Sequence, residues 1–242
     1  MQKRVLLIIP AYNEQSNILT LLDKVNSLSI TNVEIEYLVI NDCSQDSTSL
    51  LCKGANATIV NLPCNLGIGG AVQTGYIYAY NNDFDIAIQV DGDGQHDPYY
   101  VKDLIAPIVK GHADFVIGSR YIEKKGFQST VFRRMGISYF SFLIGMLYRE
   151  KVTDPTSGFR ACNKDIIKLF ALNYPTDYPE PESIVYLLRN RYRVMEVAVT
   201  MKERVGGVSS IQSFKAVYYM LKVTLAVLID TLRKRTIIEV EK

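Results

Sequence analysis

The sequence lacks paired cysteines and clustered histidines. Its four cysteines, Cys43, Cys52, Cys64 and Cys162, include no pair with CxxC spacing, and neither of its two histidines clusters with them. A zinc site is therefore not expected. Separate thiols on or near apolar runs are typical of a protein that stays in a reducing compartment.

The chain also lacks a large excess of charge and a long uncharged apolar run. Its net charge is only +2, so we expect no nucleic-acid partner that depends on a broadly basic surface. No cleavage site follows the apolar residues before Pro10, so a secretory signal peptide is not expected. The uncharged stretch 135–148 is too short to span a bilayer, and the stretch 214–232 carries three charged residues.

Short apolar runs that alternate with amphipathic segments predict the fold. We expect strands at 5–9, 36–40, 57–60, 85–90 and 115–117, with helices at 14–28, 70–80 and 99–110 and a helix that opens near 47–52. This alternation predicts an α/β fold with a Rossmann-like, mostly parallel central sheet and helices on both faces.

After Arg120 the alternation ends. We expect a loop over 123–134, helices at 132–148, 164–172 and 182–190, a turn at 157–160 and a late strand at 193–201. The absence of internal repeats and low-complexity linkers favours one domain over residues 1–211, followed by a basic amphipathic helix within 212–242.

The run from Gln89 to Pro98, QVDGDGQHDP, carries the clearest chemistry. Asp91 and Asp93 follow a predicted strand two residues apart, so their side chains would point the same way. Such a pair suits a hard divalent cation that also binds substrate phosphates. Ligands of open α/β sheets bind beyond the carboxyl ends of the strands, where this pair would lie. An ordinary polar turn is the alternative interpretation.

Two further strand ends carry polar groups at the same predicted edge. The first ends in PAYNE, residues 10–14, and the second in NDCSQDST, residues 41–48. Glu14 and Asp42 could accept hydrogen bonds from the base and ribose of a nucleotide, although residues 41–42 could also be a plain helix entry. The glycine-rich turn at 65–71 lacks the dinucleotide-binding spacing, and either approaches a ligand closely or is a simple tight turn.

These four motifs, in the order in which they occur along the chain, resemble glycosyltransferase family 2, and in particular its branch of dolichyl- and undecaprenyl-phosphate sugar synthases. The resemblance covers roughly residues 4–211. It implies a GT-A fold, a nucleotide-diphosphate sugar donor such as a UDP- or GDP-sugar, a Mg or Mn ion, and inversion at the anomeric carbon. It also implies a metal site at Asp91, Asp93 and Gln95, and a donor site at Pro10, Tyr12, Glu14, Asp42, Asp91, Gln95, Arg120 and Arg204.

The acceptor decides whether a general base is needed. A sugar hydroxyl needs one, whereas a lipid phosphate is already an anion. Where many hydroxyl-transferring relatives have a Glu-Asp pair, this chain reads YPEPES, residues 178–183. Asp154, Glu180 and Glu182 are therefore candidate catalytic residues beside Asp93, with loop solvation and a helix start as the alternative for the two glutamates.

Basic and apolar segments favour an acceptor that carries a phosphate and a lipid. Arg133, Arg134 and Arg160 would suit an acceptor phosphate, although Arg133 and Arg134 could equally form a solvated face. The stretch after Arg134 and the segment 214–232 could lie on an anionic leaflet, or pack on their own domain, on a small membrane subunit or on a second copy.

We therefore expect an inverting glycosyltransferase that acts on a polyprenyl phosphate. It would be cytoplasmic and peripheral on the inner face of the cell membrane. The alternatives are a transferase that adds sugar to a hydroxyl in a cell-surface polysaccharide, and an inactive module that only binds nucleotide sugars.

Overall fold

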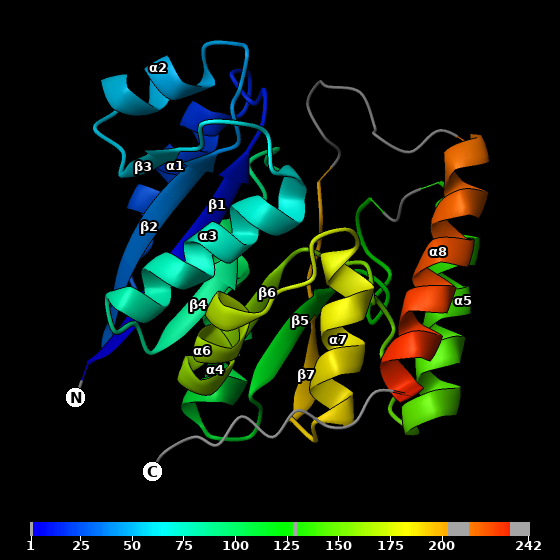
Figure 1. The fold of residues 1–242 in the computed structure, drawn as a ribbon. Helices are drawn as coiled ribbons and strands as arrows, with labels where there is room; N and C mark the ends of the chain where they lie inside the picture. The colour runs from blue at the N-terminus through cyan, green and yellow to red at the C-terminus, as the bar shows by residue number, and fades with distance from the viewer. Residues whose placement is uncertain (1, 128–129, 203–212, 233–242) are drawn as a thin grey trace.

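The computed structural model describes residues 2–127, 130–202 and 213–232. Its centre is a seven-stranded sheet in the order β3-β2-β1-β4-β6-β5-β7 (Figure 1). All neighbouring strands pair in parallel except at β6, which runs antiparallel to both β4 and β5. The strands are β1 Lys3–Ala11, β2 Val33–Asn41, β3 Ile59–Asn61, β4 Ile86–Gln89, β5 Phe115–Ser119, β6 Arg160–Asn163 and β7 Val194–Ala198.

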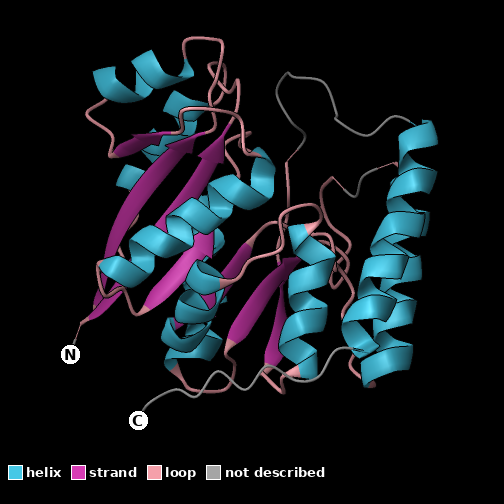
Figure 2. Ribbon diagram, in the orientation of Figure 1, coloured by secondary structure: helices cyan, strands magenta, loops and turns pink. Residues whose placement is uncertain are grey.

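Helices cover both faces of the sheet (Figure 2). The apolar strand β1 feeds two cores because successive side chains point to opposite faces. Leu6 and Ile8 pack with the helices α3, α5, α6, α7 and α8, whereas Leu7 and Ile9 pack with α1, α2 and α4. The helices are α1 Ile18–Asn26, α2 Thr48–Gly54, α3 Gly67–Asn81, α4 Val101–Val109, α5 Val131–Tyr148, α6 Lys164–Leu172, α7 Pro179–Arg189 and α8 Ser213–Leu232, with a short 3-10 turn at Pro98–Tyr100.

The expected α/β architecture is confirmed, with several local differences. Helix α7 begins at Pro179 and not at residue 182, so Glu180 lies in its first turn. Helix α1 begins at Ile18 and not at residue 14, because Asn13 has a φ of 57° and the chain turns there before the helix starts. Strand β6 follows the segment predicted as a turn at 157–160 and was not predicted at all. Its four residues include Arg160 and Asn163, so no apolar run marks it.

The last described helix, α8, belongs to the core of the domain. Val223 and Val227 are fully buried in the same core as Ile144 and Ile184 of α5 and α7. Figure 1 shows α5 and α8 side by side at one end of the molecule, beyond α7. Among the described residues, no helix combines the length and the apolar character that crossing a bilayer requires.

Candidate active site

The candidate site lies where the parallel strands β1, β2 and β4 end. Ala11 pairs with Asn41 at the end of β2, and Ile8 pairs with Gln89 at the end of β4. The segments that leave these strands therefore begin next to one another. In Figure 2 the arrowheads of β1 and β2 point toward this same edge. The expected gathering of polar residues at the carboxyl edge follows from this register.

The loop with the acidic pair crosses directly over the end of β1. The Gly92 N–H donates to Pro10 O at 3.2 Å. A Cβ added to Gly92 would lie only 2.9 Å from that same oxygen, so only glycine fits without a shift of backbone. Gly94 has a φ of 74°, which glycine adopts without strain. These glycines bring Asp91 and Asp93 close to the sheet edge.

Hydrogen bonds fix the two carboxylates. Gln89 Nε2 donates to Asp91 Oδ1 at 2.9 Å, and the Gln95 N–H donates to Asp93 Oδ1 at 3.0 Å. The Asp91 N–H donates to His96 Nδ1 at 3.0 Å. The other ring nitrogen, His96 Nε2, lies 3.7 Å from Asp91 Oδ2. The buried imidazole of His96 stacks on the ring of Phe159 with the ring centroids 4.8 Å apart. Phe159 therefore holds His96, and with it the backbone of Asp91, in place.

The donor set fits a cation that shares its ligands with a substrate. Within the described part of the chain, no group of three or more His, Cys, Asp or Glu side chains could enclose a metal ion. A Mg or Mn ion commonly takes one or two carboxylates and completes its shell with phosphate oxygens and water. Gly158 keeps space open beside this pair, because a Cβ there would lie 2.8 Å from Asp91 Oδ2.

The expected nucleoside contacts lie on the β1 and β2 side of the edge. Asp42 is buried, and its Oδ1 accepts a hydrogen bond from the Leu66 N–H at 2.7 Å, which ties the glycine-rich turn to the end of β2. Glu14 is also buried, and its Oε2 accepts from Asn17 Nδ2 at 2.9 Å. Tyr12 is exposed and Pro10 is buried. The donor roles of these four residues stay predictions.

Arg120 and Asp154 form a buried ion pair. Arg120 Nε and Nη2 donate to Asp154 Oδ2 and Oδ1, both at 2.7 Å. Burial alone would lower the pKa of Arg120, but its hydrogen bonds and charge interaction with Asp154 outweigh this and raise it. Glu196 accepts from the Asp154 N–H at 2.8 Å. Removal of either partner would leave an unpaired buried charge, which costs about 3–5 kcal/mol.

This pairing argues against Asp154 as a general base. The side chain has no exposed surface, and both carboxylate oxygens accept hydrogen bonds from Arg120. A base must reach the proton of its substrate, and Asp154 cannot do so in this arrangement. The residue instead fixes the direction of Arg120 at the end of β5.

Arg160 is buried as well, which corrects the expectation that it meets an acceptor phosphate. Its Nη1 donates to Ser183 Oγ at 2.7 Å, its Nη2 to Pro155 O at 3.2 Å, and its Nε to Ser157 O. Ser183 Oγ donates in turn to Glu180 O at 3.1 Å. Arg160 therefore joins the loop before β6 to the first turn of α7. A sequence pattern of basic residues does not distinguish such a structural arginine from an exposed one.

Glu180 is a candidate base in the first turn of α7, which Arg160 joins to the loop that passes beside Asp91. Burial raises the pKa of this half-buried carboxyl, and the charge of Asp91 adds to the rise. The positive charges of Arg160 and Arg133 oppose it. Glu180 thus shares its electrostatic surroundings with the predicted cation site and with one predicted phosphate-binding arginine. Glu182 lies half-buried in the same turn of α7.

Three further arginines were predicted to bind phosphates, and the structure describes two of them. Arg133 and Arg134 are exposed in the first turn of α5, and both lower the pKa of Tyr121, which burial raises overall. Arg204 lies outside the described residues, and its predicted contact with the donor diphosphate stays a prediction.

Sequence reasoning missed the residues that support the acidic pair. Gln89 and His96 stand inside the motif itself, but their spacing alone does not show that they contact Asp91. Glu196 could have been noticed, because it is a charged residue within the late apolar strand β7. The close approach of Gly158 to Asp91 depends on the reversed direction of β6, which was not predicted.

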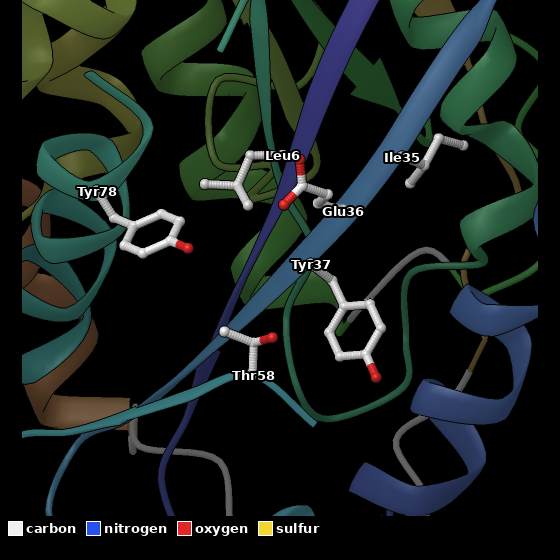
Figure 3. Close-up of a pocket in the computed structure, with 6 residues that line it drawn as sticks. All are labelled: Leu6, Ile35, Glu36, Tyr37, Thr58 and Tyr78. Carbon is white, nitrogen blue, oxygen red and sulfur yellow. The ribbon is translucent and has the colours of Figure 1, made fainter. Parts of the chain in front are cut away.

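A hollow of about 240 Å³ lies elsewhere on the molecule (Figure 3). It opens beside the first halves of β1 and β2, where Arg4 Nη2 donates to Glu36 Oε1 at 2.8 Å. The carboxyl edge with the acidic pair lies at the other end of these strands, so the hollow is separate from the candidate site. Its lining residues are Leu6, Ile35, Glu36, Tyr37, Thr58 and Tyr78.

Known proteins are similar to this chain over most of its length. The chain is 28% identical to a UDP-N-acetylglucosamine–dolichyl-phosphate N-acetylglucosaminyltransferase of Methanococcus voltae, over 94% of this chain and 99% of that protein. It is 26% identical to a polyprenol monophosphomannose synthase of Mycolicibacterium smegmatis, over 91% of this chain and 86% of that protein.

The fold is similar to that of a solved glycosyltransferase. The glucosyl-3-phosphoglycerate synthase of Mycobacterium tuberculosis, in complex with Mn²⁺, UDP and phosphoglyceric acid, superposes with a TM-score of 0.70 at 20% identity, covering 95% of this chain and 78% of that one. This likeness confirms the expected GT-A fold. Residues 6–170 match the family model described as Glycosyl transferase family 2. This match covers more than half of the sequence, so the chain belongs to glycosyl transferase family 2.

Proposed function

We propose that the protein transfers a sugar, with inversion, from a UDP- or GDP-linked donor to a polyprenyl phosphate. The observation that carries this proposal is the meeting of two kinds of group at one sheet edge. Asp91 stands with Asp93 where a donor diphosphate and its cation would bind, and Arg160 joins the loop beside Asp91 to the first turn of α7, which carries Glu180. Helix α7 packs in one core with α5, whose first turn carries the exposed Arg133. Relatives named for dolichyl-phosphate and polyprenol-phosphate sugar transfer support this acceptor.

The donor would lie along the ends of β1, β2 and β4. Glu14 and Asp42 are buried acceptors on the nucleoside side, and the glycine-rich turn that Asp42 holds lets the chain approach the ligand. Asp91, Asp93 and Gln95 would hold a Mg or Mn ion together with diphosphate oxygens. When bound, this cation would neutralise the charge that develops on the leaving nucleoside diphosphate.

The chain's own residues would orient the acceptor. Arg133 and Arg134 are exposed guanidinium groups that suit a phosphate, whereas the guanidinium group of Arg120 is paired with Asp154. A phosphate monoester is already an anion, so its oxygen can attack the anomeric carbon without a base. Arg204 would add a forked donor to the diphosphate. Attack of the acceptor from the face opposite the leaving group would give inversion.

The raised pKa of Glu180 favours one alternative, transfer to a sugar hydroxyl. Glu180 stands near Asp91, and a carboxyl whose pKa is raised is a better proton acceptor. The turnover of Glu180→Gln should differ between the two acceptors. Loss of a general base lowers turnover by roughly 10²–10⁴-fold, whereas a phosphate acceptor should lose less than about tenfold.

A direct assay tests the proposal. The protein is incubated with Mg or Mn, a panel of sugar nucleotides and undecaprenyl phosphate, and the organic phase is analysed for a charged glycolipid. Asp93→Ala should lower its formation by at least about a hundredfold, because the cation site loses a ligand. Asp103→Ala, an exposed carboxylate on α4, is the matched control. Absence of glycolipid with every donor, or full activity of Asp93→Ala, would contradict the proposal.

We also propose that the protein works at the inner face of the cell membrane, together with a small membrane subunit or a second copy of the chain. The support is chemical, since a polyprenyl chain resides in a bilayer and the nucleotide sugar in the cytosol.

A further inference from the structure

Helix α5 has an apolar stripe that the rest of the described chain does not cover. Met135, Phe142 and Met146 are 64%, 69% and 60% exposed, and Tyr139 between them is 37% exposed. Their spacing of four, three and four residues places them on one side of the helix. The opposite side is buried, through Ile137, Phe140, Leu143 and Ile144.

Helix α8 has a matching stripe. Leu221, Leu225 and Leu228 are 68%, 58% and 41% exposed and recur every three or four residues, whereas Val223 and Val227 are buried. Such large exposed apolar side chains in a row are unusual on a surface that meets only water.

The two stripes form one surface. Tyr139 Oη lies 3.1 Å from Thr224 Oγ1, and Gly136 lies beside Met220, so the helices touch along one seam. On α5 the buried residues lie on one side of this seam and Met135, Phe142 and Met146 on the other, with Tyr139 at the edge of the stripe next to α8. The same holds on α8, where Val223 and Val227 face inward. Both stripes therefore face away from the domain. Figure 1 shows the two helices side by side at one end of the molecule.

The charges around this surface are basic. Helix α5 contains no Asp or Glu, and the exposed Arg133 and Arg134 occupy its first turn. Arg149 and Lys151 are exposed just beyond its last turn, with Glu150 between them. An apolar stripe with basic residues at both ends complements an anionic bilayer, where the apolar side chains enter the acyl boundary and the arginines stay at the headgroups.

We propose that the α5–α8 surface, defined by Met135, Tyr139, Phe142, Met146, Leu221, Leu225 and Leu228, rests on an anionic lipid bilayer. It would hold Arg133 and Arg134 at headgroup level. Helix α5, which begins with these arginines, packs in one core with α7, which carries Glu180 in its first turn, so the same orientation brings the lipid phosphates toward this side of the candidate site. The relevance to the acceptor rests on the proposed function, but the docking does not.

Vesicle flotation of the full chain tests the surface. The double variant Phe142→Gln/Leu225→Gln removes two exposed side chains of the stripes, and Leu50→Gln/Leu172→Gln is the matched control on α2 and α6, at 72% and 63% exposure. Vesicles are made of phosphatidylglycerol and phosphatidylcholine in equal parts. We expect the stripe variant to lose about tenfold or more in bound fraction, and the control variant to bind like the wild type.

A second variant tests the basic end of the surface. Arg133→Gln/Arg134→Gln should lose at least about fivefold in binding to the anionic vesicles, with little change on pure phosphatidylcholine vesicles. No flotation of the wild type, or equal flotation of the stripe variant, would overturn the proposal. A dimer in light scattering that dissociates in the stripe variant, without vesicle binding, would assign the surface to a second copy and also overturn it.

A transfer assay in solution separates the docking proposal from the proposed function. Transfer to a water-soluble short isoprenyl phosphate is measured for the wild type and the stripe variant, and equal rates are expected. Flotation without any transfer would contradict the proposed function and leave the docking proposal intact. Transfer without flotation would contradict the docking proposal and leave the proposed function intact.

Discussion

The side chain of His96 sets the direction in which Asp91 presents its carboxylate. Its Nδ1 accepts the Asp91 N–H, and in the neutral ring the remaining proton is then on Nε2, which faces Asp91 Oδ2. Phe159 prevents rotation of the ring by stacking on it. Residues that orient the ligands of a cation commonly affect its affinity by 10- to 100-fold.

We therefore expect His96→Phe to need about 10- to 100-fold more Mn²⁺ for half-maximal transfer, because it keeps the stacking but loses the acceptor. His96→Asn, whose Oδ1 can accept from the Asp91 N–H, should recover part of the loss. His112→Phe, at an exposed position, is the control. Equal Mn²⁺ requirements in all four proteins would contradict this role, and thermal melting shows whether the fold is intact.

The elevated pKa of Glu180 has a consequence for stability. Burial makes the folded state bind this proton more tightly than the unfolded state, in which the pKa is near its ordinary 4.5. The free energy of unfolding should therefore fall as the pH rises through the range between 4.5 and the raised folded value. Glu180→Gln removes this dependence.

Urea unfolding in the presence of EDTA measures the effect. Relative to the wild type, Glu180→Gln should gain stability as the pH rises above 4.5, because the buried carboxyl of the wild type ionises there and the glutamine does not. Glu150→Gln, an exposed glutamate after α5, should show no such trend. A difference between wild type and Glu180→Gln that does not change with pH would contradict the assignment.

At the scale of elements, the start of α3 packs under the segment that leads to α7. A Cβ on Gly69 would lie 2.4 Å from Thr176 O and 2.7 Å from Thr176 Cα. These are backbone atoms, so a side chain at Gly69 cannot be accommodated by a rotamer change. The glycine-rich turn that Asp42 holds is thus in contact with the chain just before Glu180.

Gly69→Ala should destabilise the protein by about 1–3 kcal/mol, the usual cost of overpacking, and should also raise the KM for the sugar nucleotide because the turn must move. Gly54→Ala, at the end of α2, is the control, since nothing lies within 4 Å of its added Cβ. Urea unfolding and donor titration measure the two effects. Equal stability of the two variants would contradict the close approach of Gly69 to the backbone of Thr176.

The elements differ in how far the sequence could predict them. Strands β1 and β4 were predicted because both faces of a central parallel strand are buried and the apolar run is continuous. The acidic pair was predictable because it ends such a strand. Strand β6 was not, since Arg160 and Asn163 interrupt its pattern, and the burial of Arg160 depends on oxygens of residues 155, 157 and 183. These contacts arise from tertiary structure and leave no local signal.

At the scale of the whole molecule, α8 is part of one cooperative core. Val227→Ala should lower the free energy of unfolding by about 1–3 kcal/mol, because the substitution leaves a cavity in the core shared with α5 and α7. Leu228→Ala, at an exposed position, should change it by less than about 0.5 kcal/mol. Both variants should unfold in a single transition. An early separate transition in Val227→Ala would mean that α8 folds independently.

The antiparallel strand β6 lies in the middle of the sheet, between β4 and β5. It pairs with β4 from Ile86 opposite Asn163 to Gln89 opposite Arg160. The half of the molecule that carries the nucleoside side and the half that carries α5, α7 and α8 are thereby joined by one continuous ladder. A hinge between the two halves would have to break these hydrogen bonds. The sheet thus forms one continuous framework, and the loops at its carboxyl edge can change conformation without breaking the ladder of β4, β6 and β5.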